Sequence, residues 1–342
     1  MHMADALLSP SVGIAFGAIS AGAMACSVAK LKKDEFLDHK IPFMGIAGAL
    51  VFAGQMINFT IPGTGSSGHI GGGILLAGLL GGIPAFLSIV AVLIIQCLFF
   101  ADGGLLALGC NIVNMGAIPC FVVYPLVFKP LIKRGITPAR LSLASIASVM
   151  TGLEMGAVFV VLQTTASGIT ELPFGIFAAF LLPIHLAIGL VEGIVTAAVL
   201  CFVHQARPEI LEGTNAEKRI GSGMSLQKVL VIFAVLAVVT GGAFSIFASS
   251  DPDGLEWALK KTAGTTELDA GGFVHDGATA VQGALAFLPE YHFPGVDEDV
   301  RPLGTSASGV IGAIITFVLA GTAGFAISKV KKAKKRTLSD AE

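Results

Sequence analysis

Long apolar stretches, separated by short polar ones, run along almost the whole chain. A helix rises about 1.5 Å per residue, so about 20 apolar residues cross the roughly 30 Å hydrocarbon core of a membrane. Eight stretches approach or exceed that length, at 11–29, 41–59, 84–101, 105–128, 141–163, 174–203, 227–248 and 308–328. A ninth, the glycine-rich stretch 70–82, is shorter and is expected to form a short helix. The pattern predicts an all-α polytopic membrane protein of about nine transmembrane helices, a seven-helix core plus two.

The composition supports this class of protein. Hydrophobic residues make up 54% of the chain and charged residues 13%, about half the share typical of soluble domains. The 43 glycines suit closely packed membrane helices. The five cysteines show no CxxC spacing and are expected to be free thiols. The basic residues lie in short clusters between apolar stretches, so we expect membrane lipid and no nucleic acid as a partner.

The positions of the basic residues predict an orientation, because Lys and Arg concentrate in cytoplasmic loops. With the N-terminus outside, nine crossings and the C-terminus inside, 18 of the 21 Lys and Arg residues fall on the inner side. The remaining three, Lys260, Lys261 and Arg301, lie in segment 249–306, which is expected to be an outer loop. Without the short helix at 70–82, the basic cluster at 129–140 would face outward.

The chain is expected to have three parts. Residues 1–205 form a seven-helix core, residues 206–226 a polar cytoplasmic linker, and residues 227–342 a two-helix domain that carries the outer loop. The sequence contains no internal repeat.

A glycine-rich stretch after the second apolar run contains a G-x-G-x-x-G pattern at Gly63, Gly65 and Gly68. A dinucleotide site also needs a preceding strand and a following amphipathic helix in a soluble sheet, and the sequence predicts neither. The sequence has no G-K-[ST] motif and no HExxH motif, so we expect neither an ATPase nor another enzyme. The stretch is therefore interpreted as an outer loop that presents the imidazole of His69.

The start of the chain, "MHMADALLSP", lies on the same predicted face as that loop. The α-amine of Met1, the deprotonated amide nitrogen of His2 and the His2 imidazole can close two fused chelate rings. His69 could supply a fourth nitrogen. A square of nitrogen donors suits Ni(II) or Cu(II), and cobalt is also compatible. The alternative is that His2 occupies the second position by chance.

Four stretches carry a resemblance to a known family: "MHMADALLSP", "GTGSSGHIGGG", "FADGGLLALGCNIVNMG" and "PIHLAIGLVEGIVTAAV". Over about 1–205 the chain resembles the CbiM/NikM family, the substrate-capturing membrane subunits of energy-coupling factor transporters for cobalt and nickel. The stretch "DPDGLEWAL" resembles the small CbiN/NikN subunit, fused here as 227–342. The resemblance implies metal binding by Met1, His2 and His69. It also implies separate partners, a transmembrane coupling subunit and cytoplasmic ATPase subunits.

Other polar residues in the apolar stretches are candidates for supporting roles, because buried polar groups in a membrane are costly. Asp102, Asn111 and Asn114 are expected to hold the donors in place by hydrogen bonds rather than to bind metal. His185 and Glu192 are expected to lie too far from the outer face to reach the site. In the outer loop, transient metal binding and simple solvation both remain open for three residues, His275, Asp276 and His292.

These features predict a protein of the prokaryotic cell membrane that captures Ni(II) or Co(II) outside and delivers it inward. Nickel and cobalt both remain candidates, because the same donors accept both. The alternative is a secondary transporter driven by an ion gradient. Such a transporter would favour inverted repeats and paired carboxylates near mid-membrane, whereas the sequence offers isolated Glu154 and Glu192. Since all proposed donors lie in 1–205, we expect this part to bind metal without 227–342.

Overall fold

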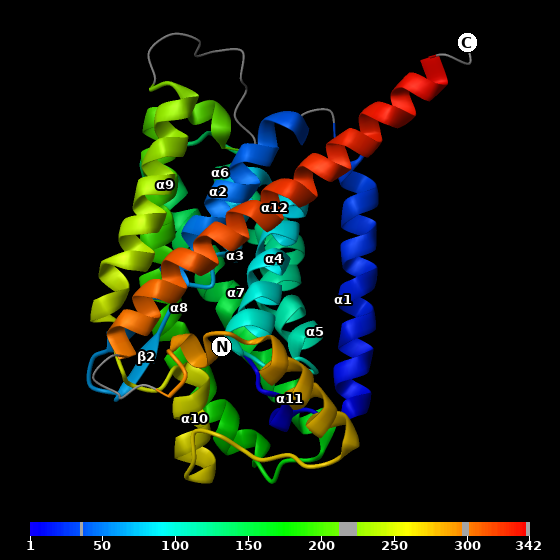
Figure 1. The fold of residues 1–342 in the computed structure, drawn as a ribbon. Helices are drawn as coiled ribbons and strands as arrows, with labels where there is room; N and C mark the ends of the chain where they lie inside the picture. Colours follow the sequence, from blue (N-terminus) through cyan, green and yellow to red (C-terminus); the bar gives the residue numbers. More distant parts are fainter. Residues whose placement is uncertain (35–36, 212–223, 296–300, 340–342) are drawn as a thin grey trace.

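The computed structural model describes residues 1–34, 37–211, 224–295 and 301–339, except the side chains of residue 39 and of 333–339. Most of the expected linker, 206–226, lies outside the described residues. The chain forms a mostly helical bundle, with the N-terminus near one end and the last helix, Arg301–Ser339, extending beyond the other (Figure 1). We refer to the end that carries the N-terminus as the site end.

Each of the nine predicted stretches contains a helix. The long ones are α1 (Pro10–Leu31), α2 (Leu37–Gln55), α4 (Gly82–Phe100), α7 (Pro138–Ser167), α8 (Phe174–Ala206), α9 (Leu226–Gly242) and α12 (Arg301–Ser339). One further span runs through α5 (Leu108–Asn111), the π-helix η2 (Ile112–Phe128) and α6 (Lys129–Ile132). The short stretch forms α3 (Gly73–Leu80).

The structure confirms a multi-pass membrane protein. Within the described residues, 7 spans are long and apolar enough to cross a membrane, while α2 contributes a shorter apolar helix and α3 has only 8 residues. The count of nine crossings and the orientation therefore remain predictions. Large apolar side chains are exposed on the outer faces of several helices, among them Ile14, Leu190, Val235 and Phe317. Exposed apolar side chains in this number suit contact with lipid.

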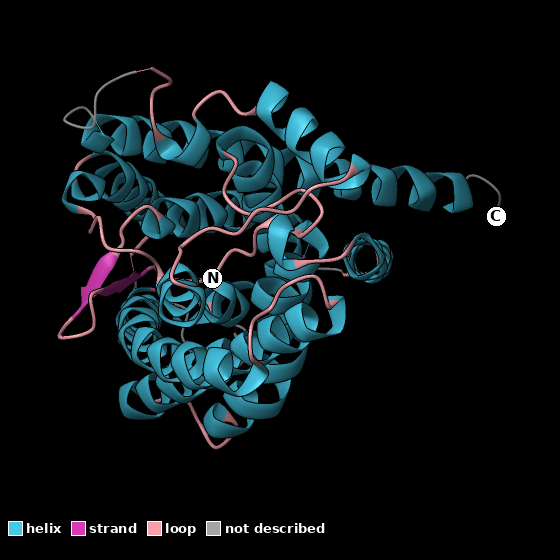
Figure 2. Cartoon of the chain, turned by 90° about the horizontal axis from the view of Figure 1, so that it is seen from below, coloured by secondary structure: helices cyan, strands magenta, loops and turns pink. Residues whose placement is uncertain are grey.

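The smaller elements gather mainly at the site end. They are β1 (Phe59–Ile61), β2 (Ser66–Gly68), α10 (Gly254–Ala263), α11 (Phe273–Leu285), and the 3₁₀ turns η1 (Asp5–Leu7), η5 (Phe244–Phe247) and η6 (Pro289–Tyr291). A further turn, η3 (Pro208–Ile210), follows α8. Viewed from the site end, the N-terminus lies near the centre of the molecule, surrounded by these elements (Figure 2).

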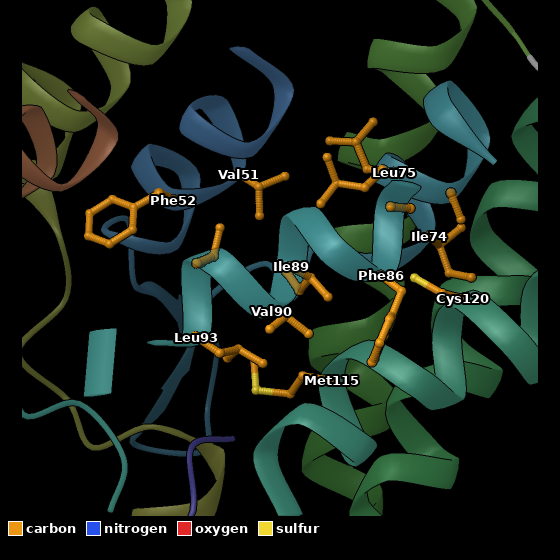
Figure 3. Close-up of a cluster of buried hydrophobic side chains, with 14 of the residues drawn as sticks. Val51, Phe52, Ile74, Leu75, Phe86, Ile89, Val90, Leu93, Met115 and Cys120 are labelled. Carbon is orange, nitrogen blue, oxygen red and sulfur yellow. The ribbon is translucent and has the colours of Figure 1, made fainter. Parts of the chain in front are cut away.

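The centre of the bundle is filled by apolar side chains of α4 and its neighbours (Figure 3). Phe86 and Ile89 of α4 are fully buried, and Met115 of η2 is almost so. Such tightly packed interiors keep helices in fixed positions. The core thus provides a rigid base for the polar groups at the site end.

The second part of the chain packs directly on the first. Helix α12 lies along α2 and α9 and crosses the bundle obliquely (Figure 1). The backbones of α9 and α12 lie in contact, because a Cβ atom added to Gly309 would clash with the carbonyl oxygen of Gly241. Small residues allow this close approach.

The loop that carries His69 begins with a short hairpin. Strands β1 and β2 are antiparallel, with Phe59 opposite Gly68. The connecting turn uses Gly63 and Gly65 with φ of +77° and +71°, values that glycine adopts without strain. The chain then enters the bundle before α3 begins at Gly73.

Candidate metal centre

The first residues of the chain are buried at the site end and held by backbone contacts. The Met3 amide donates to Asn111 Oδ1 at 2.8 Å, and Asn111 Nδ2 donates to the Met3 carbonyl at 3.2 Å. Asn114 Nδ2 donates to Gln163 Oε1 at 2.8 Å and contacts the Met3 sulfur at 3.7 Å. Both asparagines therefore contact the first residues of the chain, and their supporting role in metal binding stays a prediction.

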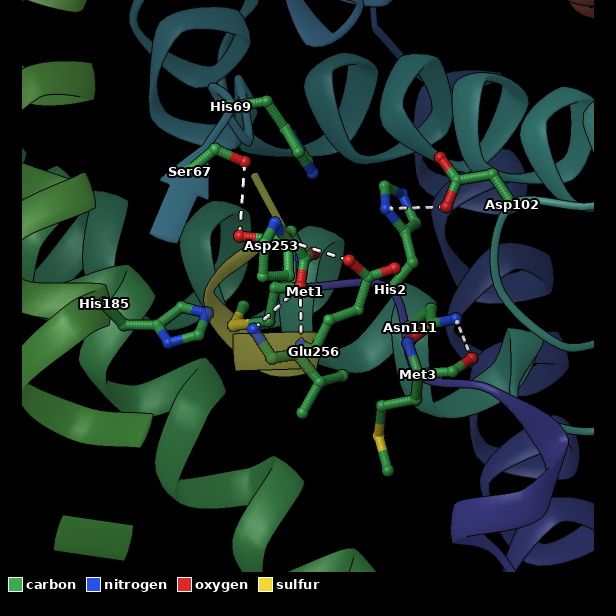
Figure 4. A network of polar contacts seen from close by, with 12 residues as sticks. Met1, His2, Met3, Ser67, His69, Asp102, Asn111, His185, Asp253 and Glu256 are labelled. Carbon is green, nitrogen blue, oxygen red and sulfur yellow. Dashed lines mark hydrogen bonds and ion pairs between the residues drawn. The ribbon is translucent and has the colours of Figure 1, made fainter. Parts of the chain in front are cut away.

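The α-amine of Met1 is paired with a carboxylate from the second part of the chain (Figure 4). It lies 2.8 Å from Asp253 Oδ2. Asp253 also caps α10, because its Oδ1 accepts from the amides of Leu255 and Glu256 at 2.8 and 2.9 Å. Burial raises the pKa of Asp253, but the adjacent ammonium outweighs it and the net shift is well downward. Asp253 was not among the site residues predicted from the sequence.

The His2 ring lies between two acceptors. Its Nε2 lies 3.1 Å from Gln96 Oε1, and its Nδ1 lies 3.2 Å from Asp102 Oδ1. Burial of the ring lowers its pKa, partly offset by Asp102. Asp102 also accepts a hydrogen bond from the Tyr291 hydroxyl. Asp102 therefore contacts the His2 ring, and its supporting role in metal binding stays a prediction.

His69 stacks on His2, with ring centroids 5.3 Å apart and the planes inclined by 22°. Its Nδ1 lies 3.0 Å from the carbonyl oxygen of Ile70 and donates to it. In that tautomer the lone pair is on Nε2, the nitrogen available to a metal. Burial, the N-terminal ammonium and His2 together lower the pKa of His69 to about 4.

The hairpin before His69 is held by residues 249–257, which we term the clamp segment. The Ser67 amide donates to the Pro252 carbonyl at 2.8 Å, and Ser67 Oγ donates to the Asp251 carbonyl at 2.7 Å. Trp257 Nε1 donates to the Thr64 carbonyl at 3.0 Å. The second part of the chain thus contacts both the N-terminus and the His69 loop.

His185 and Glu192 of α8 lie close to the site, so the expectation that they are remote was wrong. His185 lines a cavity of about 10 Å³ together with Met1, His69 and Asp253. Glu192 Oε1 accepts from the Gly72 amide at 2.8 Å. The reason is that residues 69–72 run into the bundle as irregular chain and reach the middle of α8.

The three outer-loop candidates do not join this group. His275 is buried on α11 and its Nε2 bonds the Leu8 carbonyl at 2.9 Å. Asp276 is exposed, and His292 contacts Arg301. Among the described residues, no group of three or more His, Cys, Asp and Glu side chains is placed to hold a metal. The four-nitrogen donor set expected from the sequence differs from such a group of side chains, because two of its nitrogens belong to the backbone.

Comparisons with known proteins show similarity to cobalt and nickel transport proteins. Residues 2–210 match the family model CbiM, the cobalt uptake substrate-specific transmembrane region, and residues 227–329 match the PDGLE domain. The chain is 31% identical over 335 residues to an Archaeoglobus fulgidus protein named as a fused nickel transport protein NikMN, covering 96% of this chain and 98% of that one. It is 32% identical over 217 residues to the cobalt transport protein CbiM of Sorangium cellulosum, covering 62% and 95%.

A solved structure of a transition metal transporter is also similar. It superimposes with a TM-score of 0.52 at 27% identity, over 60% of this chain and 92% of that one. The similarity extends to the fold as well as to the sequence.

Proposed function

Because the chain belongs to the CbiM family of cobalt uptake substrate-specific transmembrane proteins, we propose that it captures Ni(II) or Co(II) for import. Its relatives carry names that refer to nickel or cobalt transport. The observation that carries the proposal is the convergence of the adjacent residues Met1 and His2 with His69, which is distant from them in the sequence, at one end of the bundle.

The proposed ligands are four nitrogens. They are the α-amine of Met1, the amide and Nδ1 of His2, and Nε2 of His69. Only Nδ1 of a histidine side chain can close a six-membered ring with its own amide nitrogen, because Nε2 is one atom further away. A planar array of nitrogen donors suits Ni(II), and Co(II) is accepted by the same donor types.

Binding requires a rearrangement of the groups seen in the structure. The ammonium of Met1 and the amide of His2 each have to release a proton to the surrounding water, and the amine has to leave Asp253 Oδ2. The stacked rings of His2 and His69 have to turn so that Nδ1 and Nε2 point at a common position. Asp102 and Asp253 remain nearby and stabilise a cation by their negative charge.

The proposed setting is an energy-coupling factor importer in the cell membrane. In this proposal the site end faces outside, the chain crosses the membrane nine times, and 1–205 captures metal while 227–342 supports it. A transmembrane coupling subunit and cytoplasmic ATPase subunits supply the energy, since the sequence carries no ATPase motif.

Measuring the metal content of the purified protein tests the proposal and also shows whether nickel or cobalt is bound. The full chain is purified from cells grown with equimolar nickel and cobalt, beside His2→Ala and Thr60→Ala variants. Thr60 is exposed and bonds Ser249, so its loss controls for general changes in the hairpin. We expect about one metal ion per chain in the unaltered and Thr60→Ala proteins and none in His2→Ala. Equal metal in all three would refute the proposed site.

A further inference from the structure

Two buried glutamines connect the two histidines of the site. Gln96 of α4 is fully buried and Gln55 of α2 is 4% exposed. Gln96 Oε1 lies 3.1 Å from His2 Nε2, and Gln96 Nε2 donates to Gln55 Oε1 at 2.8 Å. Gln55 Nε2 in turn donates to the Gly71 carbonyl at 3.0 Å. The chain of hydrogen bonds thus runs from the His2 ring to the backbone two residues after His69.

The Gly71 carbonyl determines which atom donates in each hydrogen bond of this series. The carbonyl of Gly71 can only accept, so Gln55 must turn its amino group toward it. The Gln55 oxygen then faces Gln96 and requires the Gln96 amino group. This places Oε1 of Gln96 against His2, and an oxygen there can only accept a proton from Nε2.

This arrangement leaves Nδ1 of His2 for the cation. A neutral imidazole carries one hydrogen, and Gln96 Oε1 accepts it when it is on Nε2. Nδ1 faces Asp102 Oδ1 at 3.2 Å, so without a cation this carboxylate competes with Gln96 for the ring hydrogen. A cation at Nδ1 takes the place of a hydrogen there and is attracted by the carboxylate, and the ring hydrogen is then on Nε2, against Gln96.

We infer that Gln55 and Gln96 form a positioning relay that couples the His2 ring to the His69 loop and commits His2 to bind metal through Nδ1. The inference rests on the proposed function. The relay also explains why two amides are buried in apolar helices, since their hydrogen bonds fix one orientation of the ring. Groups that hold a metal-binding histidine through its second nitrogen typically change metal affinity by about 10–100-fold when removed.

Substitutions at Gln96 test the hydrogen bond itself. In the full chain, Gln96→Met keeps the size of the side chain but removes its oxygen, and we expect Ni(II) affinity in isothermal titration to fall by about 10–100-fold. Gln96→Glu keeps an oxygen that accepts from Nε2 but loses the donor to Gln55 Oε1, so its loss of affinity should be smaller than that of Gln96→Met. Equal losses in both variants would overturn the relay.

A matched control separates the relay from general damage to the core. Ser88 is also a fully buried polar residue of α4, and its hydroxyl donates to the Pro84 carbonyl at 3.0 Å rather than to the site. We expect Ser88→Ala to bind Ni(II) much as the unaltered chain does. If Ser88→Ala and Gln96→Met lose affinity equally, the relay is refuted.

A spectroscopic measurement on the unaltered chain does not depend on the folding of any variant. Four-nitrogen square-planar Ni(II) is diamagnetic, so ¹⁵N-histidine NMR can be recorded on the nickel-loaded protein. We expect His2 Nε2 to carry a slowly exchanging proton. A His2 Nε2 without a proton would overturn the relay.

A third comparison separates failure of the relay from failure of the proposed function. If His2→Ala loses Ni(II) while Gln96→Met binds normally, only the relay is wrong. If His2→Ala itself binds Ni(II) normally, the proposed site is wrong as well.

Discussion

At the scale of single residues, His69 offers a direct test of the ligand set. Its ring contacts His2 and the Ile70 carbonyl, so His69→Ala removes little helix packing. We expect the variant to fold but to lose Ni(II) affinity by more than the roughly 10–100-fold typical of groups that only support a ligand. Isothermal titration with thermal unfolding as the folding control gives the answer, and an unchanged affinity would contradict the four-nitrogen set.

The proposed use of the Met1 amine predicts a strong effect of extending the chain. Adding Gly-Ser before Met1 turns the amine into a peptide nitrogen and removes the ion pair with Asp253. We expect Ni(II) binding to be abolished, whereas the same two residues added after Glu342 should leave it intact. Titration of both proteins with Ni(II) compares them directly, and equal affinities would show that the amine is not a ligand.

The lowered pKa of His69 predicts the pH range in which protons compete with metal at this residue. A proton on the imidazole blocks metal binding, so affinity falls as pH falls through the pKa. Because that pKa is about 4, the imidazole of His69 should stay neutral at pH 6. An NMR titration of metal-free, ¹⁵N-histidine-labelled protein should place its midpoint near pH 4. A midpoint near the ordinary value of 6.5 would contradict the geometry.

Sequence reasoning placed the two histidines on one face of the molecule but missed several of the residues that contact them. His2 and His69 could be linked because a chelating N-terminus is a local pattern and both segments were expected on one face. Gln55 and Gln96 carried a usable signal, since an amide inside an apolar helix needs a partner. Asp253 carried none, because its contact with Met1 depends on how the second part packs on the first.

At the scale of elements, the clamp segment should stabilise the hairpin before His69. Trp257→Phe keeps an aromatic ring against Phe180 but removes the donor to the Thr64 carbonyl. We expect the hairpin to lose about 1 kcal/mol of local stability. Hydrogen exchange of residues 59–68 should then be roughly fivefold faster, with α4 unchanged as the internal control. No change in the hairpin would mean that the contact does not hold it.

The glycine-rich stretch 70–82 marks the limit of prediction from apolar length. It was expected to form one short helix, and the structure places an irregular entry before an eight-residue helix, α3. Gly72, with φ of +80°, makes the bend, and its amide is held by Glu192. A hydropathy pattern reports only how many apolar residues follow one another. It could not predict that the Glu192 carboxylate of α8 would accept a hydrogen bond from the Gly72 amide.

At the scale of the whole molecule, the distribution of basic residues predicts that the site end faces outside. A cysteine placed in the hairpin turn, Thr64→Cys, should react with a membrane-impermeant maleimide added to intact cells. Lys133→Cys, in the loop after α6 at the opposite end, should react only after the cells are opened. The chain with its natural cysteines, all free thiols, gives the background. The reverse pattern of labelling would invert the proposed topology.

The contacts of the clamp segment with the hairpin have a consequence for how the site responds to dilution. Were the two parts separate polypeptides, those contacts would form only when the concentration exceeded their dissociation constant. A covalent connection instead holds the partners at a fixed effective concentration. The contacts of Ser67 and Met1 with the clamp segment therefore form to the same extent however many copies of the protein the cell makes. Two separately encoded chains would have to match their levels of synthesis to achieve the same.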